Sequence, residues 1–239
     1  LDFLPGSVEW ADFDPTATAN AIALLDVPAG LDRALVERTF ALYMREWRRK
    51  RSGEVPSNNY SAYEIRIIGA LVRLERRDDA LELLRFFLAE RRPLAWNQWP
   101  EITWKDARAP AHIGDVPHTW IAAEYVLALR SLFAYEREAD ATLVLAAGLA
   151  DEWLVGEGVR VRAMPTLYGA LSYSLRRRDD STLLCVLEAG TSARLLLRPP
   201  LRGRIRAVQV NGAAHTGFGD TQIELPGAPA ELIISEARG

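Results

Sequence analysis

The sequence predicts an α+β fold, in which a helical segment (residues 1–138) is followed by an antiparallel β-sandwich domain (residues 139–239). Three observations predict it. In the first segment, apolar side chains recur every three or four residues, which is typical of helices. In the second, apolar and polar residues alternate, as in Val159-Arg160-Val161-Arg162, which is typical of strands. Turn dipeptides such as Asn211-Gly212 separate these short alternating stretches.

Five helices are expected in the first segment. Asp14-Pro15 predicts the start of the first helix, because Asp caps helices and Pro fits their first turn. Ser57 is the expected cap of the third helix, and Pro93 follows the end of the fourth. The expected helices cover residues 15–26, 31–50, 58–75, 80–91 and 118–137, with a long loop over 92–116.

Seven short strands are expected in the second segment. Asp179-Asp180 has the composition of a hairpin turn between two of them. The expected strands cover residues 159–162, 171–176, 182–187, 194–197, 205–210, 221–225 and 231–235.

The order of the helices predicts where a functional site lies. Short turns join the first helix to the second and the third to the fourth, so the first, third and fifth helices should start at the same end of the bundle. A polar, aromatic-rich stretch precedes each of these three starts. One rim of the helical segment is therefore the expected site.

Composition limits the classes of function. The chain has 239 residues, with 29 Lys and Arg against 32 Asp and Glu, a net charge of -3. This balance favours neither nucleic acid nor an anionic membrane as a partner. Cys185 is the single cysteine, so no internal disulfide forms. No uninterrupted apolar run reaches the length of a membrane span.

No cofactor or metal motif is recognisable. HExxH, CxxC, EF-hand and glycine-rich phosphate-loop patterns are absent from the sequence. His112, His118 and His215 do not form a convincing set of metal ligands, because His215 lies far away among the strands. We therefore expect no cofactor and no metal site.

The chain begins with Leu1 and a stretch that is neither a signal peptide nor a transit peptide. We expect it to be a piece of a longer protein. The sequence does not give its cellular location; a periplasmic or secreted location would follow if the longer protein carries a signal peptide.

The long loop and the fifth helix hold the densest group of candidate site residues. Flat aromatic faces beside amides and carboxylates suit a sugar ring, whose C–H face packs on an aromatic ring and whose hydroxyls need donors and acceptors. We therefore expect an oligosaccharide or polysaccharide partner. The candidates for sugar contact are Trp96, Asn97, Gln98, Trp99, His118 and Trp120 from this region, and Asn59, Tyr60 and Tyr63 from the third helix. The simpler alternative is that the Trp side chains cover the end of the bundle.

Glu101 and Asp115 are the candidate catalytic carboxylates. Cleavage of a glycosidic bond needs two carboxyl groups, one of which protonates the leaving oxygen while the other acts as base or nucleophile. The structural alternatives are that Asp115 caps the fifth helix and that Glu101 is a solvated loop charge.

Trp96-Asn97-Gln98-Trp99-Pro100-Glu101, followed by Gly114-Asp115-Val116-Pro117-His118-Thr119-Trp120 and Leu132-Phe133-Ala134-Tyr135-Glu136, resembles the end of bacterial six-hairpin glycosidases. These are (α/α)6-toroid proteins of the glucoamylase, trehalase and disaccharide phosphorylase type, some of which carry discoidin-like (coagulation factor 5/8-like) domains. The resemblance implies a partial toroid followed by the β-domain. It also implies a catalytic base from the late loop, Glu101 first and Asp115 second.

The resemblance places the general acid on an earlier hairpin. Five helices are too few for a closed ring of twelve, so we expect that acid in a missing N-terminal part of the same protein. The isolated chain should then be inactive.

Two other functions remain open at this point. The first is a polysaccharide lyase of the toroid-plus-sandwich type, which would use residues such as Asn58, Asn59, Tyr60 and His118. The second is a non-catalytic module that binds glycan or packs against another domain.

Overall fold

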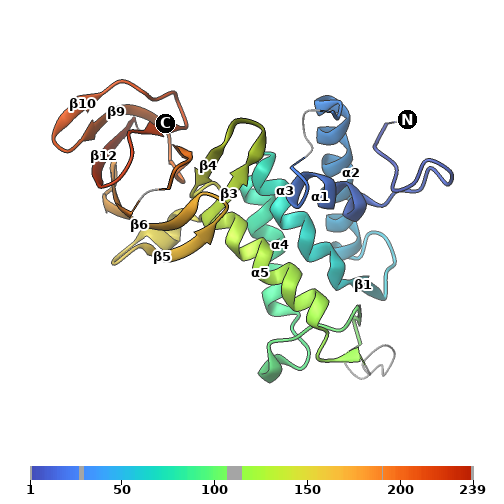
Figure 1. Cartoon of the computed structure of the whole chain (residues 1–239). Helices are drawn as coiled ribbons and strands as arrows, with labels where there is room; N and C mark the ends of the chain where they lie inside the picture. Colours follow the sequence, from blue (N-terminus) through green and yellow to red (C-terminus); the bar gives the residue numbers. More distant parts are fainter. Residues whose placement is uncertain (1, 27–29, 107–114, 190, 238–239) are drawn as a thin grey trace. The chain divides into compact units, whose positions relative to one another are not determined.

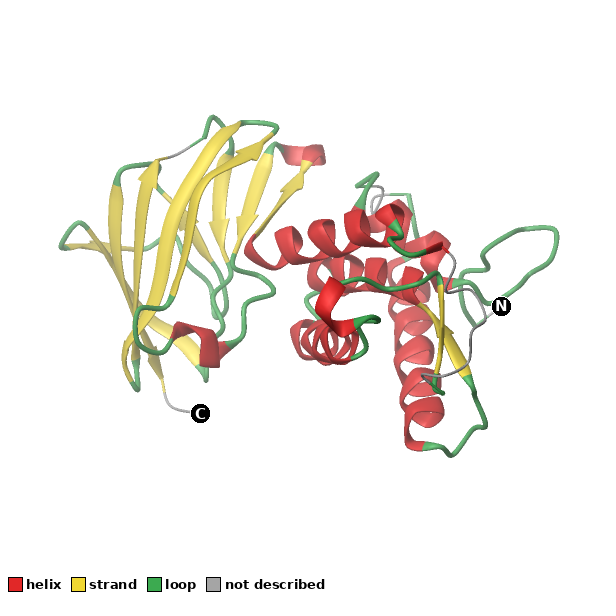
Figure 2. Ribbon diagram, turned by 90° about the horizontal axis from the view of Figure 1, so that it is seen from below, coloured by secondary structure: helices red, strands yellow, loops and turns green. Residues whose placement is uncertain are grey.

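The computed structural model describes residues 2–26, 30–106, 115–189 and 191–237 and confirms the α+β class (Figures 1 and 2). The chain forms two compact units, Leu1–Arg130 and Ser131–Gly239. The division expected after residue 138 lies inside the second unit. Among the described helices, none is both long enough and apolar enough to cross a bilayer.

Helices α1 (Pro15–Ala23) and α2 (Arg33–Ser52) begin at aspartate caps, as their sequences predict. The Asp14 carboxylate accepts from the backbone N–H of Thr16, and the Asp32 carboxylate does the same for the second helix. Helix α2 ends at Gly53, whose φ of +83° is the left-handed conformation that glycine adopts without strain. These caps set where both helices begin and where α2 ends.

The prediction of a single helix over residues 58–75 is wrong. The segment instead forms strand β1 (Asn59–Ser61), the 3-10 helix η1 (Ala62–Arg66) and helix α3 (Ile67–Arg73). The cap is Ser61, whose hydroxyl accepts from the Tyr63 N–H, and not Ser57. Strand β1 exists because it pairs with the long loop, so Tyr60 and Tyr63 do not share one helix face.

Strand β2 (Ile102–Trp104) is the partner of β1 and lies within the expected loop. The two strands are antiparallel, with Asn59 opposite Trp104 and Ser61 opposite Ile102. The Ala62 N–H adds a hydrogen bond of 3.0 Å to the Glu101 carbonyl. This ribbon ties the start of η1 to the catalytic loop expected from the sequence. Helix α4 (Arg77–Ala89) and the 3-10 turn η2 (Leu94–Trp96) lead into it.

Helix α5 (Thr119–Phe133) is shorter than expected. Residues 134–137 continue the apolar pattern but form strand β3 (Ala134–Arg137), because they pair antiparallel with β4 (Thr142–Leu145). A short 3-10 turn, η4 (Glu138–Asp140), joins the two strands, and η5 (Asp151–Leu154) follows β4. Pairing with a neighbouring strand therefore overrides the local helical pattern.

The second unit is a two-sheet sandwich. Six strands pair antiparallel in the order β10-β9-β12-β7-β6-β5, and four pair in the order β11-β8-β4-β3. The second sheet is not wholly antiparallel, as we expected, because β4 and β8 run parallel. The remaining bounds are β5 (Val159–Thr166), β6 (Gly169–Asp179), β7 (Thr182–Ala189), β8 (Arg194–Leu197), β9 (Arg204–Val210), β10 (Ala213–His215), β11 (Ile223–Leu225) and β12 (Ala230–Ala237).

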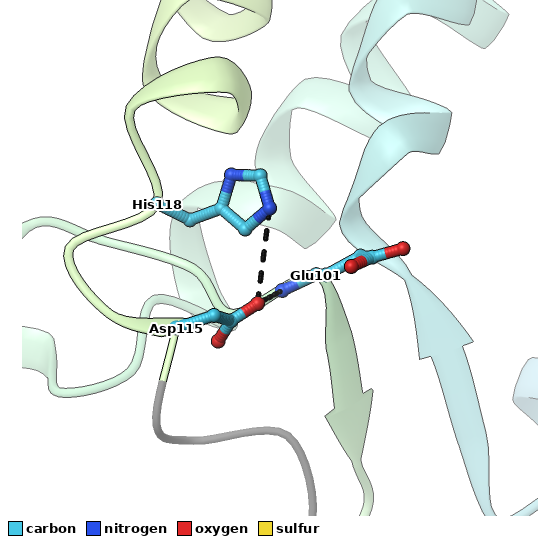
Figure 3. A group of neighbouring side chains, drawn as sticks. All are labelled: Glu101, Asp115 and His118. Atoms are coloured by element: carbon cyan, nitrogen blue, oxygen red, sulfur yellow. Dashed lines mark hydrogen bonds and ion pairs between the residues drawn. The ribbon is translucent and has the colours of Figure 1, made fainter.

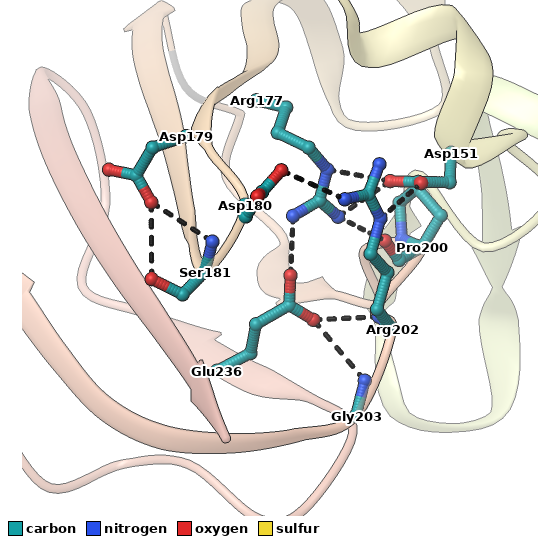
Figure 4. A network of polar contacts seen from close by, with 9 residues as sticks. All are labelled: Asp151, Arg177, Asp179, Asp180, Ser181, Pro200, Arg202, Gly203 and Glu236. Atoms are coloured by element: carbon teal, nitrogen blue, oxygen red, sulfur yellow. Dashed lines mark hydrogen bonds and ion pairs between the residues drawn. The ribbon is translucent and has the colours of Figure 1, made fainter. Parts of the chain in front are cut away.

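Alternating burial along β6, β7 and β12 gives the larger sheet one buried face, whereas β4 is buried throughout. Leu175, Leu187 and Leu232 are buried on the first sheet, and Leu143 and Leu197 on the second. At one end of the unit, Arg177 joins Asp151 and Glu236 in a buried network of polar contacts (Figure 4).

Candidate functional site

The helical unit contains an open cleft of about 1100 Å³. Its walls come from the starts of α1 and α5, from β1 and η1, from the second half of α2 and from the end of α4. Two of the three helix starts expected on one rim therefore lie at this cleft, and β1 and η1 take the place of the third. The lining combines aromatic rings with charged groups of both signs. Among the lining residues are Phe13, Asp14, Tyr43, Trp47, Tyr60, Tyr63, Glu64, Arg66, Lys105 and Trp120.

Four of the candidate sugar contacts line this cleft: Asn59, Tyr60, Tyr63 and Trp120. Trp120 is the most exposed of the three aromatic residues among them, with 60% of its surface accessible. Its indole packs edge-to-face with the Tyr63 ring at 5.5 Å between centroids. The two rings therefore offer an apolar surface at one end of the cleft, flanked by polar groups.

Glu101, Asp115 and His118 come together beside this end (Figure 3). One Asp115 carboxylate oxygen accepts from the Glu101 backbone N–H at 3.1 Å and faces the His118 Nε2 at 3.7 Å. Asp115 thus connects the loop before β2 to the segment that enters α5. Its contacts are those of a group that positions the loop, whereas the Glu101 side chain is half-buried.

These three side chains also have the composition of a divalent-cation site, since their ligand atoms lie within 4.8 Å of one another. The hydrogen bonding of His118 argues against that use. Its Nδ1 accepts from the Ile121 N–H at 3.4 Å, which favours the proton on Nε2. A metal would need the Nε2 lone pair, whereas a protonated Nε2 faces Asp115. The arrangement therefore fits an Asp115–His118 contact better than a metal centre.

Tyr63 links this group to the cleft. Its ring contacts the His118 ring edge-to-face at 5.9 Å, and the Arg66 guanidinium lies over it at 4.9 Å. Loss of solvation and the nearby Glu101 charge both raise the pKa of the Tyr63 hydroxyl, while Arg66 lowers it. The Tyr63 hydroxyl is therefore a neutral donor close to the Glu101 carboxylate.

The other four loop candidates do not line the cleft. Trp96 is 60% exposed on η2, and Asn97 accepts a hydrogen bond from Arg91. Gln98 is half-buried, and its backbone carbonyl accepts from the backbone N–H of Arg92. Trp99 is 1% exposed, and its indole N–H donates to the Phe87 carbonyl at 2.8 Å. Trp99 is thus part of the core, as in the simpler alternative, and cannot meet a sugar without unpacking. His112 lies outside the described residues.

Sequence reasoning missed Glu64, a half-buried carboxylate in the cleft wall. The buried Tyr43 hydroxyl donates to its Oε2 at 2.5 Å. Loss of solvation raises the pKa of Glu64, and the nearby Asp14 charge raises it further, against the lowering effects of Tyr43, Lys50 and Ser61. The signal was present in the sequence, because Glu64 and Arg66 are the two charges in an otherwise apolar stretch.

Sequence reasoning also missed the pair Arg66 and Glu124, which lies under Trp120. The two side chains are 11% and 6% exposed and meet at 2.8 Å. The Trp120 N–H donates to the same Glu124 oxygen at 3.2 Å. This pair holds the indole in place at the cleft edge. The spacing of Trp120 and Glu124 by one helical turn was a usable signal.

Comparison with known proteins gives only weak likeness. No family model matches the chain, and no curated protein matches it in sequence. Among solved structures, the chain is similar to a GH127 β-L-arabinofuranosidase from Geobacillus stearothermophilus T6, with 12% identity and a TM-score of 0.35. The match covers 93% of this chain and 41% of that one, so the chain spans less than half its length. No residue role follows from this likeness.

Proposed function

We propose that this chain carries the sugar-binding cleft and the base-supplying loop of a glycoside hydrolase-like enzyme, and that it works within a longer protein. The observation that carries the proposal is the exposed Trp120 indole at the edge of a 1100 Å³ cleft, next to the Glu101 group. An indole face packs against the C–H face of a sugar, and the flanking carboxylates and amides pair with its hydroxyls.

Glu101 is the proposed catalytic base. Hydrolysis requires a carboxylate that takes a proton from the attacking water at the anomeric carbon. Asp115 is the proposed positioning residue, because its carboxylate accepts from the Glu101 backbone N–H. This hydrogen bond does not involve the Glu101 carboxylate. Tyr63 supplies a neutral hydroxyl beside the same carboxylate.

One observation favours hydrolysis over the lyase alternative. A lyase needs a base that removes a carbon-bound proton, and a tyrosine acts as such a base when its pKa is lowered. Loss of solvation and the Glu90 charge instead raise the pKa of Tyr60 well above the ordinary value. The Tyr60 hydroxyl also donates to Glu90 at 3.1 Å, so it is held as a neutral donor.

The binding half of the proposal is tested with matched tryptophan variants. Trp120→Ala and Trp96→Ala remove indoles that are equally exposed, but only the first lines the cleft. We expect Trp120→Ala to weaken binding of soluble oligosaccharides about 5- to 30-fold in calorimetry and Trp96→Ala to leave it unchanged. The screen would cover arabinose-, glucose- and galacturonate-based oligosaccharides.

The catalytic half is tested with the full-length gene product. Glu101→Gln should lower kcat about 100-fold or more on a hydrolysed glycoside, with the product released as a saturated reducing sugar. An unsaturated product that absorbs in the ultraviolet would show that the reaction is an elimination and not a hydrolysis. Binding without any cleavage would leave the non-catalytic glycan module as the function.

A further inference from the structure

Among the described residues of the cleft wall, Glu64 is a carboxylate without an Arg or Lys partner. Among the described residues, no Arg or Lys nitrogen lies within ion-pair distance of Glu64, although Glu64 sits in the cleft wall. The other acids of the wall are engaged: Asp14 caps α1, Glu46 pairs with Arg49, and Glu90 pairs with Arg92. Glu64 differs from these three acids because it neither forms an ion pair nor caps an α-helix; its partners are the Tyr43 hydroxyl and the Ser61 backbone N–H.

The backbone places Glu64 at the same end of the β1–β2 ribbon as Glu101. Ser61 is opposite Ile102, and the Ala62 N–H donates to the Glu101 carbonyl at 3.0 Å. Glu101 thus directly precedes one strand of the ribbon, and Glu64 lies in the helical turn that directly follows the other. Because the ribbon is hydrogen-bonded, the two carboxylates belong to one rigid unit of backbone.

Two donors act on the Glu64 carboxyl: the Tyr43 hydroxyl donates to Oε2 at 2.5 Å, and the Ser61 backbone N–H lowers its pKa. Among the described residues, Tyr43 is the one side-chain donor, so Oε1 has no side-chain partner and can carry the proton. The charged groups that act on Glu64 are Asp14 at the start of α1 and Lys50 near the end of α2. Their effects oppose each other, so burial decides the protonation state and favours the neutral acid.

We propose that Glu64 is the proton-donating acid of this cleft and that Tyr43 positions it. The inference rests on the proposed function and differs from the expectation that the acid lies outside the chain. In the reaction, the Glu64 proton moves to the glycosidic oxygen as the bond from the anomeric carbon to that oxygen breaks. Water forms the new bond to the anomeric carbon and gives its proton to Glu101. Proton exchange with solvent then restores both carboxyl groups.

The test uses the dependence on the leaving group. A departing alkoxide or sugar needs the acid's proton, whereas fluoride or dinitrophenolate departs without it. In the full-length gene product, Glu64→Gln should lower kcat about 100- to 10,000-fold on a disaccharide or alkyl glycoside. The same variant should lose less than about tenfold on the glycosyl fluoride or dinitrophenyl glycoside. Glu37→Gln, on helix α2 but outside the residues that line the cleft, is the control and should leave both rates unchanged.

A second variant keeps the inference testable if Glu64→Gln does not fold. Tyr43→Phe removes the hydrogen bond that stabilises the Glu64 carboxylate, so it should move the alkaline limb of the kcat profile to higher pH. A purely structural role of Tyr43 would lower kcat without moving that limb.

The outcomes separate this inference from the proposed function. An active wild type in which Glu64→Gln affects both substrate classes equally, or neither, overturns the role of Glu64 and leaves the proposed function standing. A wild type that cleaves no glycoside of the panel overturns both.

Discussion

Two carboxylates withdrawn from solvent, one in each unit, are treated in opposite ways by the fold. Glu236 in the β-unit is 2% exposed and meets Arg177 at 2.5 Å. Its second oxygen accepts from the backbone N–H groups of Arg202 and Gly203 (Figure 4). Both carboxylate oxygens of Glu236 thus have hydrogen-bond donors. Among the described residues, Glu64 in the helical unit has a single side-chain donor, the Tyr43 hydroxyl, and no cation within ion-pair distance.

Arg177, the partner of Glu236, also has several hydrogen-bond partners. Its guanidinium, 4% exposed, donates to Asp151, Glu236 and the Pro200 carbonyl. Burial acts to raise the pKa of Asp151, but hydrogen bonds from Arg202 and Arg177 outweigh it and lower that pKa. Such closed networks hold strands together and leave no atom for a ligand. Glu64, by contrast, has no ion pair among the described residues. We take this difference to separate a charge that stabilises the fold from an acid that is available for chemistry.

The largest expected effect comes from opening the closed network. Arg177→Met should destabilise the β-unit by about 3–5 kcal/mol, because Glu236 stays buried without its cation. Arg178→Met, on the same strand but exposed, should change stability by less than about 0.5 kcal/mol. Urea unfolding of both variants gives the measurement. Equal effects of the two variants would show that the network adds nothing.

A smaller effect is expected from the buried pair beneath Trp120. Arg66→Met leaves Glu124, which is 4% exposed, with the Trp120 N–H as its remaining donor, so the helical unit should lose about 2 kcal/mol. Oligosaccharide binding should weaken as well, because the indole loses its anchor. A stable variant with unchanged binding would separate Trp120 from the pair. Arg45→Met, at an exposed position on α2, is the control.

The Glu64 carboxyl should cost stability as pH rises. Its folded pKa is raised above the ordinary value of 4.5, so the native state binds the proton more tightly than the unfolded chain. Wild-type stability therefore falls as pH increases from about 4.5 through the folded pKa, by about 1.4 kcal/mol for each unit of the rise. Glu64→Gln lacks this loss and should exceed wild type at about pH 8.

Urea midpoints at about pH 4, 6 and 8 measure this difference, and Glu46→Gln is the control for stability. Hydrogen bonds from Arg45 and Arg49 lower the pKa of Glu46, so its removal should give no gain at high pH. A constant difference between wild type and Glu64→Gln across this range would contradict the raised pKa.

The smallest effect belongs to an exposed pair. Hydrogen bonding from Arg137 lowers the pKa of Asp140 to about 2. Its contribution is present above the ordinary Asp pKa and is lost as pH falls towards 2, so Asp140→Asn should be less stable than wild type at neutral pH and match it in strong acid. Calorimetric unfolding at both extremes, with the exposed Glu9→Gln as reference, checks this.

Periodicity predicted the α+β class and most elements, because helix caps and alternating strands are local signals. Asp14 and Asp32 begin their helices, and the strands flanking Asp179-Asp180 form the expected hairpin. The β1–β2 ribbon was not predictable, because it pairs segments about 40 residues apart whose local patterns resemble a helix and a loop. Residues 134–137 were expected to extend the fifth helix, but they pair with the neighbouring strand β4 across a short turn.

The candidate site was predicted in part. Tyr63 and Trp120 lie in the cleft, and Glu101, Asp115 and His118 form one group as their clustering in the sequence suggested. Composition could not distinguish Trp99 from Trp120, because burial depends on what packs over each ring. Glu64 was missed because its role arises from Tyr43, which comes from a different helix.

The most direct test of the account is the protonation of Glu64 in the wild-type protein. Carbon-13 labelling of the glutamate carboxyls, assigned with Glu64→Gln, allows its titration to be followed by NMR. We expect Glu64 to titrate above the ordinary glutamate range, and Tyr43→Phe to move the titration further up. A Glu64 that titrates within or below that range, indifferent to Tyr43, would contradict it.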